Sequence, residues 1–373
     1  MKIAILIRNF SASGGGAERY AVATAFELAN LHDVHVFSQE YESPLPGIKH
    51  HAVPAPCERP RWINQIYFAW KTWRLTRLGF DRVISHENTW HGDVQVVHVL
   101  PVRHMLWAER TGLRWALLWL RVMSSPRLLA YLWLEAMRYR RQPGRQIVAT
   151  SGTLAQVIVT TYPSTTRMLR TITPGVDATA EPTVEQDPFK LRRDLGLPTD
   201  VPLLLFVGND MRKKGLPTLL KVMADIPNVH LAVVGQGEHT QAMQKLAEPL
   251  RGRVHFLGAV PEMFRVYRAA DMLVHPTLED TYAMVVLEAM SHGLVVVVSD
   301  SKWCGIAKEL IDERDAVILK DPLDTPNLTC TLLSLLGDDY RRKSLSANAR
   351  IFAANRSWSY VGLQFDELIN EKD

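Results

Sequence analysis

Both halves of this chain repeat one pattern, in which an apolar strand, a short turn, a helix and another apolar strand follow each other. In the first half, a predicted strand at 2–8 precedes three glycines at 14–16, a helix at 17–31 and a strand at 33–37. Continuous apolar strands separated by helices are typical of a parallel sheet covered on both faces. Further strands of this sheet are expected at 82–85, 94–97 and 146–149.

The second half has the same alternation. Its strands are expected at 201–207, 229–234, 254–257, 272–275 and 295–298, and its helices at 216–224, 263–269 and 282–292. The fold class predicted is therefore α/β, with two Rossmann-like, doubly wound parallel-sheet domains facing each other across a cleft that holds the active site. The length of 373 residues agrees with two domains rather than one.

Composition excludes several classes of protein. Three widely spaced cysteines form neither a disulfide framework nor a four-ligand zinc site, and they fit a reducing cytoplasm. The first residues show no signal-peptide pattern, and the apolar stretch 113–123 is interrupted by two arginines and is too short for a membrane span.

Charge is distributed unevenly along the chain. Residues 1–180 carry 21 Lys and Arg against 12 Asp and Glu, a net +9, whereas the remainder carries 22 against 27, a net −5. The basic half is expected to face something anionic.

Two turns are candidates for binding phosphate. Gly15 and Gly16 lie at a strand-to-helix turn, where backbone N–H groups can approach a phosphate or a sugar, although a turn without a ligand explains them equally well. Arg212, Lys213 and Lys214 follow the strand that ends at Gly208, which is where doubly wound folds bind ligands. Such cations would neutralise a diphosphate; the alternative is a solvated loop of charges.

The sharpest signal is a pair of carboxylates eight residues apart. Asp280 precedes a predicted helix and Glu288 lies within it, and the helix start at 282–285 would present free N–H groups to an anion. A carboxylate flanked by apolar neighbours is costly to bury unpaired, and a vicinal diol would satisfy Glu288. The alternative is a capping Asp and an unrelated helix Glu.

Taken together, these residues resemble the retaining family-four glycosyltransferases of GT-B fold, and among them the branch that builds the lipopolysaccharide core. The matching positions occur in the family's order along almost the whole chain: Gly15-Gly16-Ala17-Glu18-Arg19, Thr173-Pro174-Gly175-Val176-Asp177, Gly208 with Lys214-Gly215, Val234-Gly235-Gln236-Gly237, Phe256-Leu257-Gly258, Ala270-Asp271, and the pair Asp280 and Glu288.

The resemblance implies a division into domains. The N-terminal, acceptor-binding domain would comprise 1–172 plus 356–373, with a last helix near 358–369 that crosses back onto it. The C-terminal, nucleotide-sugar-binding domain would comprise 173–355, with a polar, proline-bearing stretch at 177–188 just past the boundary.

The resemblance also assigns roles. Glu288 would bind the ribose diol and Asp280 the hydroxyls of the transferred sugar. Lys214, helped by Arg212 or Lys213 and by the backbone at Ala283, Met284 and Val285, would hold the diphosphate. Gly15 and Gly16 would close over the phosphates or the sugar from the other domain. The expected catalytic residues are Asp280, Lys214 and His98, and no metal is expected because Lys and backbone groups do its work.

Two positions depart from the family pattern. Asp280 stands where the family has Glu, one methylene longer, and Asn209 stands where an Arg commonly follows Gly208. Both departures bear on the choice of donor more than on the fold. His98, at the end of a predicted strand, is equally compatible with a functional and a structural role; Asn88 is a fainter acceptor-side candidate.

The segment 103–145 is rich in arginine and tryptophan, and 101–145 contains nine arginines and no lysine. Trp115, Leu118 and Trp119 would form one helical stripe. This composition suits an anionic membrane interface. A core helix with outward-reaching arginines is the alternative, and nucleic acid is not expected as a partner because no nucleic-acid module accompanies the charge.

The activity implied is retaining transfer of a hexose from a nucleoside-diphosphate sugar, UDP-glucose or a related UDP-hexose, to a lipopolysaccharide-core or other lipid-linked acceptor. No further cofactor is expected. The location implied is cytoplasmic, peripheral on the inner face of the bacterial cytoplasmic membrane. Two alternatives stay open: a nucleotide-sugar hydrolase or epimerase of the same fold, and a catalytically silent nucleotide-sugar-binding protein.

Overall fold

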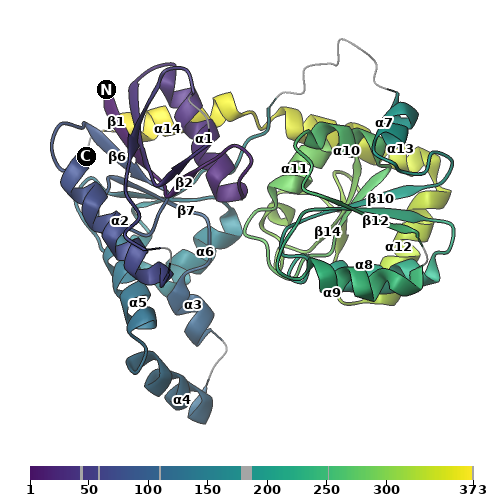
Figure 1. Cartoon of the computed structure of the whole chain (residues 1–373), viewed down its shortest axis with the longest axis horizontal. Coiled ribbons are helices and arrows are strands. Elements are labelled where there is room, and N and C mark those ends of the chain that lie inside the picture. The colour runs from purple at the N-terminus through teal and green to yellow at the C-terminus, as the bar shows by residue number, and fades with distance from the viewer. Residues whose placement is uncertain (43–44, 58, 109–110, 178–186, 251, 372–373) are drawn as a thin grey trace. The chain divides into compact units, whose positions relative to one another are not determined.

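The computed structural model describes residues 1–42, 45–57, 59–108, 111–177, 187–250 and 252–371, and the chain divides into two compact units (Figure 1). Unit 1 comprises Met1–Pro174 and Trp358–Asp373, and unit 2 comprises Gly175–Ser357. The boundaries predicted from the sequence stood after residues 172 and 355. Most of the predicted polar stretch at 177–188 lies outside the described residues, which omit 178–186.

Unit 1 is built on a parallel sheet of strand order β5-β3-β1-β6-β7-β8-β9. Its strands are β1 (Lys2–Leu6), β3 (Asp33–Ser38), β5 (Ile48–Ala52), β6 (Arg82–Ser85), β7 (Val94–Val97), β8 (Gln146–Ala149) and β9 (Leu169–Thr171), and β2 (Asn9–Phe10) pairs with β4 (Glu40–Tyr41) in a small second sheet. The interior residues of β1 are completely buried, as the apolar pattern predicts.

Helices cover both faces of this sheet. The helices of unit 1 are α1 (Gly16–Ala29), α2 (Arg61–Thr76), α3 (Val102–Trp107), α4 (Gly112–Met123), α5 (Pro126–Arg138), α6 (Gly152–Thr161) and α14 (Trp358–Asn370), with a 3₁₀ turn at Pro163–Thr165. The last helix, α14, returns from the end of the chain to pack against α1 (Figure 1). At the other extreme of unit 1, α4 packs against α5 and protrudes from the sheet (Figure 1).

Unit 2 is built on a parallel sheet of strand order β12-β11-β10-β13-β14-β15. Its strands are β10 (Leu203–Val207), β11 (His230–Val234), β12 (Val254–Gly258), β13 (Met272–His275), β14 (Val295–Ser299) and β15 (Val317–Leu319). Its helices are α7 (Pro188–Asp194), α8 (Leu216–Asp225), α9 (Thr240–Ala247), α10 (Met263–Ala269), α11 (Met284–Ser291), α12 (Thr325–Gly337) and α13 (Asp339–Ala354), with 3₁₀ turns at Glu248–Leu250 and Gly305–Lys308.

The two doubly wound α/β domains predicted from the sequence are confirmed. In unit 2, the chain order reverses between β10 and β13, which lie side by side in the middle of the sheet. The segments that follow the carboxyl ends of these two strands diverge there, and this is where open α/β sheets bind ligands. The topology therefore brings the loop after β10 and the loop after β13 to one place.

Candidate functional site

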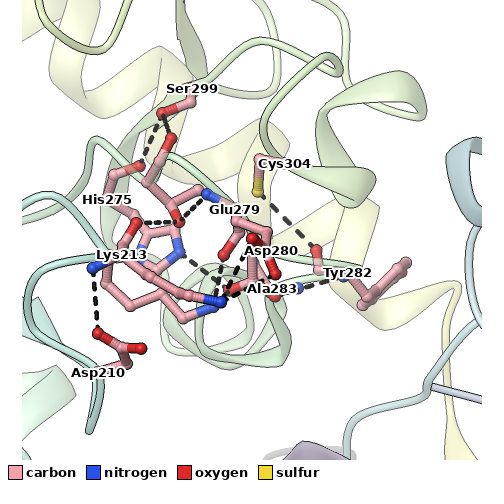
Figure 2. A network of polar contacts seen from close by, with 11 residues as sticks. Asp210, Lys213, His275, Glu279, Asp280, Tyr282, Ala283, Ser299 and Cys304 are labelled. Carbon is pink, nitrogen blue, oxygen red and sulfur yellow. Dashed lines mark hydrogen bonds and ion pairs between the residues drawn. The ribbon is translucent and has the colours of Figure 1, made fainter. Parts of the chain in front are cut away.

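The candidate site of unit 2 has Asp280 at its centre (Figure 2). Asp280 Oδ2 lies 2.6 Å from Lys214 Nζ and 3.2 Å from His275 Nε2. Burial alone would raise the pKa of Asp280, but the hydrogen bond from His275 and the charge of Lys214 outweigh it and hold that pKa below its usual range. The carboxylate is therefore ionised at neutral pH.

Asp280 also organises the start of helix α11. Its Oδ1 accepts a hydrogen bond from the backbone N–H of Ala283 at 2.9 Å and a longer one from that of Tyr282 at 3.4 Å. Ala283 has φ +71°, unusual for a residue other than glycine, so the helix begins at Met284 rather than at Tyr282 as predicted. The expectation that all N–H groups at 282–285 are free is thus wrong for Tyr282 and Ala283. Met284 and Val285 occupy the first helical turn, where N–H groups have no intrahelical acceptor.

The loop after β10 supplies the cations. Lys214 Nζ donates to the backbone oxygen of Glu279 at 3.1 Å, and Lys213 Nζ lies 3.2 Å from Oε1 of the same Glu279. The two loops are also joined through their backbones, because Leu278 N donates to Lys213 O at 2.7 Å. Arg212 is exposed beside them. The solvated-loop alternative therefore fits Arg212 and Lys213 better than Lys214, whose side chain is largely buried.

Gly215 makes this approach of the two loops possible. Its φ is +84°, and a Cβ built there would lie 1.9 Å from the backbone oxygen of Pro276. The neighbouring turn is held by Gly208, whose N–H donates to Val234 O at 2.9 Å, and by Asn209, whose Oδ1 accepts from Gln236 N at 3.2 Å. Asn209 therefore joins the ends of β10 and β11.

Glu288 is buried in α11, eight residues beyond Asp280. The hydroxyl of Tyr267, on α10, donates to Glu288 Oε2 at 2.8 Å. The ring of Tyr267 stacks on His292 at 5.4 Å between centroids. The hydroxyl of Tyr267 thus satisfies one oxygen of the Glu288 carboxylate, for which a vicinal diol was the expected partner.

Sequence reasoning missed His275 and Tyr267 as partners of the two acids. His275 is completely buried at the end of β13, and burial lowers its pKa more than Asp280 raises it. A histidine that ends an otherwise apolar strand is the signal that could have been read; the side-chain partner of Glu288 lies 21 residues away and leaves no local signal.

In unit 1, the glycine turn is held by one carboxylate. Gly15 caps the start of α1, which begins at Gly16. Ser11 and Ser13 lie just before the glycines. Glu42 accepts hydrogen bonds from the hydroxyls of Ser11 and Ser13, each at 2.6 Å, and from Ser13 N at 3.1 Å. These bonds lower the pKa of Glu42 to about 2. Glu42 thus holds Ser11 and Ser13, the residues that lead into the glycines.

His98 follows β7 and is half-buried. Its Nε2 lies 3.0 Å from His86 Nδ1, and Tyr20 packs edge-on against its ring. Burial, together with the nearby charge of Arg138, lowers the pKa of His98 to about 3, so the ring is neutral at pH 7. A neutral ring can donate or accept a hydrogen bond, but it is a weak base for proton transfer. Asn88 lies nearby in sequence, and its backbone oxygen accepts from Gln65 Nε2 at 3.0 Å.

The three residues of the predicted stripe lie on one helix, α4, but they differ in exposure. Leu118 is buried, whereas Trp115 and Trp119 are each 46% exposed, so the three do not share one environment. These exposed side chains contradict the alternative of a helix packed wholly in the core.

In the part of the chain that the structure describes, no helix is both long and apolar enough to cross a membrane. Among the same residues, no three His, Cys, Asp or Glu side chains are grouped as a metal site would require.

Comparison with known proteins places both units in one group of enzymes. Two family models match the chain: Glycosyltransferase Family 4 over residues 14–180, and Glycosyl transferases group 1 over residues 187–352. It is 24% identical over 363 residues to the lipopolysaccharide glucosyltransferase WaaG of Escherichia coli K12, which covers 95% of this chain and 94% of the relative. It is 30% identical over 241 residues to a D-inositol 3-phosphate glycosyltransferase of Corynebacterium jeikeium, which covers 60% of this chain and 57% of that protein.

Solved structures resemble the whole chain. The crystal structure of WaaG, a glycosyltransferase involved in lipopolysaccharide biosynthesis, matches with a TM-score of 0.85 at 22% identity, over 99% of this chain and 100% of that one. HepE of Anabaena in complex with UDP-glucose matches with a TM-score of 0.77 at 17% identity, over 98% of each chain. At these identities the likeness establishes the fold.

Proposed function

This chain is a family-four glycosyltransferase of GT-B fold, and from that premise we propose that it is a retaining hexosyltransferase that uses a UDP-sugar, UDP-glucose first among them. The acceptor we propose is a lipopolysaccharide core or another lipid-linked glycan, by analogy with the name of the WaaG relative. Transfer would need no metal. The HepE complex, in which a protein of the same fold binds UDP-glucose, supports the choice of donor.

One observation carries the proposal. The fold brings together a cation and two acids from separate parts of the sequence. Lys214 follows β10, Asp280 follows the neighbouring strand β13, and Glu288 lies in α11, the helix after β13. A cation beside the N-terminus of a helix suits a diphosphate, and a buried acid behind it suits a ribose diol.

In this arrangement, Lys214 and the N–H groups of Met284 and Val285 would hold the diphosphate, with Arg212 and Lys213 as outer cations and Gly208 and Asn209 lining the turn. Fixed cations and N–H dipoles that face developing negative charge stabilise a transition state. The leaving phosphate would accept the proton of the incoming hydroxyl. The contacts expected of Gly15, Gly16 and His98 with the donor stay predictions, with the neutral His98 acting by hydrogen bonding.

The first test is binding of UDP and UDP-glucose to the whole chain by isothermal titration calorimetry. Glu288→Ala removes two charge-assisted hydrogen bonds to a diol, about 2–4 kcal/mol, and should weaken UDP binding about 30- to 900-fold. Glu262→Ala is the matched control, because Glu262 is an exposed acid of the same unit that pairs with Arg265. Equal UDP affinities for the two variants would contradict the ribose assignment.

The second test concerns the reaction. The enzyme is incubated with UDP-glucose, with and without lipopolysaccharide truncated at successive core sugars, and with EDTA in parallel. Glucose transferred with the α configuration, read by NMR and unaffected by EDTA, is the expected result. Free glucose without acceptor would favour the hydrolase alternative. UDP binding without turnover on a broad panel of donors and acceptors would favour the catalytically silent protein.

We also propose that unit 1 docks on an anionic membrane surface through α4 and α5, at the cytoplasmic face. Among the described side chains of α4, five large apolar ones are exposed, Trp115, Leu117, Trp119, Leu120 and Met123, and Arg121 and Arg127 are exposed beside them. Each basic contact with an anionic leaflet contributes about 1 kcal/mol, and aromatic rings favour the interface.

Flotation with vesicles tests the membrane proposal. Wild type should float with vesicles containing anionic lipid, less so at high salt, and a variant with Trp115 and Trp119 changed to Ser should float less. Tyr340→Ser, at an 85% exposed aromatic of unit 2, is the control. Binding that ignores salt and lipid charge would count against docking by charge.

A further inference from the structure

The carboxylate of Asp280 is fully occupied by groups of the protein itself. An ionised carboxylate offers about four acceptor sites. In the structure, Lys214 Nζ and His275 Nε2 use Oδ2 at 2.6 and 3.2 Å, and the N–H groups of Ala283 and Tyr282 use Oδ1 at 2.9 and 3.4 Å. A sugar hydroxyl can therefore reach Asp280 only when one of these partners gives up its place.

Lys214 is the partner that can leave. Its side chain is 23% exposed and ends a flexible four-carbon stem, and its Nζ already has a second acceptor in Glu279 O. The N–H groups of Tyr282 and Ala283 belong to backbone that is fixed nearby, because Asp280 N donates to Trp303 O and Ile306 N donates to Tyr282 O. His275 is completely buried at the end of β13 and cannot follow.

His275 faces Asp280 as a neutral hydrogen-bond donor. Its Nδ1 has no hydrogen-bond partner among the described residues, and its Nε2 faces a carboxylate that can only accept. The proton therefore resides on Nε2. A neutral donor keeps the Asp280 carboxylate in position without adding the charge that Lys214 adds.

We propose that His275 is a positioning residue that holds Asp280 while Lys214 exchanges from Asp280 to the diphosphate of the nucleotide sugar. The exchange rests on the proposed donor site. It makes Asp280 a competitor of the diphosphate for Lys214, and it frees one side of Asp280 for a sugar hydroxyl at the moment the diphosphate binds. Donor binding and sugar positioning are thereby linked through one lysine.

The exchange predicts opposite effects on two measurements. Asp280→Asn removes the competing charge, so UDP should bind about five- to tenfold more tightly, while kcat for sugar transfer falls. Asp324→Asn is the matched control: Asp324 caps α12 by accepting from Asn327 N, and Asn can do the same. UDP affinity that is unchanged or weaker in Asp280→Asn would overturn the exchange.

The positioning role is tested at His275 by separating binding from turnover. In His275→Leu, UDP affinity should stay within about threefold of wild type, while kcat falls about 10- to 100-fold. His275→Gln, whose amide can donate from nearly the same place, should recover most of the rate. Parallel loss of UDP affinity and kcat, or a Gln variant as slow as the Leu variant, would overturn the role.

The same titrations distinguish this inference from its premise. Wild type that binds neither UDP nor UDP-glucose would overturn the proposed function and the exchange with it. Wild type that binds UDP normally, beside an Asp280→Asn variant of unaltered affinity, would overturn the exchange alone and leave the donor site standing. If His275→Leu does not fold, His275→Gln and Asp280→Asn still decide the matter.

Discussion

Replacing Gly215 by alanine should destabilise unit 2 for two separable reasons. The first is conformational: Gly215 has φ +84°, where an alanine costs about 1–2 kcal/mol. The second is steric: the new Cβ would lie 1.9 Å from Pro276 O, and contacts under 3.0 Å are essentially never seen for real Cβ atoms. The obstacle is backbone, so the loop after β10 and the loop after β13 must move apart.

The steric part resembles the overpacking of a core, which typically costs about 1–3 kcal/mol. The free energy of unfolding should therefore fall by about 2–5 kcal/mol in Gly215→Ala. Gly196→Ala isolates the conformational part, because Gly196 has φ +68° in the same unit and a Cβ there meets nothing within 4 Å. That control should lose only about 1–2 kcal/mol.

Differential scanning calorimetry of the full chain measures the difference. For a unit of this size, 1 kcal/mol corresponds to about 2–4 °C in Tm, so the transition of unit 2 should fall about 2–12 °C further in Gly215→Ala than in Gly196→Ala. UDP binding should weaken in Gly215→Ala alone, because Lys214 precedes the displaced residue. Equal Tm shifts for the two variants would refute the claim that the collision with Pro276 matters.

Three further predictions concern other parts of the molecule. Tyr267→Phe deletes the hydroxyl that donates to Glu288, and urea denaturation should show a loss of about 1.5–3 kcal/mol in the free energy of unfolding; an unchanged midpoint would contradict the bond's importance. The pKa values of His98 and His292 are lowered to about 3 and about 4, so as pH falls the unfolded chain takes up protons on these residues before the folded chain does. Their contribution to stability is therefore complete above pH 6.5 and is lost as pH falls toward those values. Urea midpoints at a series of pH values should fall accordingly, and a rise below pH 6.5 would refute the sign. The lowered pKa of Glu42 makes its contribution complete above pH 4.5 and lost toward pH 2, and Glu42→Gln should flatten acid denaturation in that window, which circular dichroism can follow.

The sequence predicted buried strands better than exposed ones. Met272–His275 and Val94–Val97 were predicted at their observed bounds, because continuous apolar runs between helices leave little choice of structure. The edge strand β5 was missed. Its sequence at 48–52 is largely polar, and contacts with other elements stabilise it: His51 Nε2 lies 2.7 Å from His35 Nδ1, and the ring of His50 stacks on Tyr41. Such tertiary contacts leave no periodicity in the sequence.

In the candidate site too, features set by local sequence could be predicted, and features set by tertiary contacts could not. The spacing of Asp280 and Glu288 and the position of Lys214 after a strand were visible along the chain, because each depends on a local element. The pairing of Lys214 with Asp280 depends on strand order, since β10 and β13 are neighbours in the sheet although Asp280 lies 66 positions after Lys214 in the sequence. The left-handed backbone of Ala283 could not be predicted at all, because alanine has no local preference for it.

An aspartate at position 280, where the family resemblance leads one to expect a glutamate, has a structural consequence. Asp favours the start of helices because its short side chain lets a carboxylate oxygen reach N–H groups two and three residues ahead, which is how Oδ1 meets Tyr282 and Ala283. The backbone of Asp280 is fixed on both sides, since its N–H donates to Trp303 O and its carbonyl accepts from Gly305 N. A glutamate on the same backbone would carry its carboxylate about one bond further out, beyond these N–H groups. The carboxylate of Asp280 is therefore held in one position, and in the proposed donor site a sugar hydroxyl would have to approach it there.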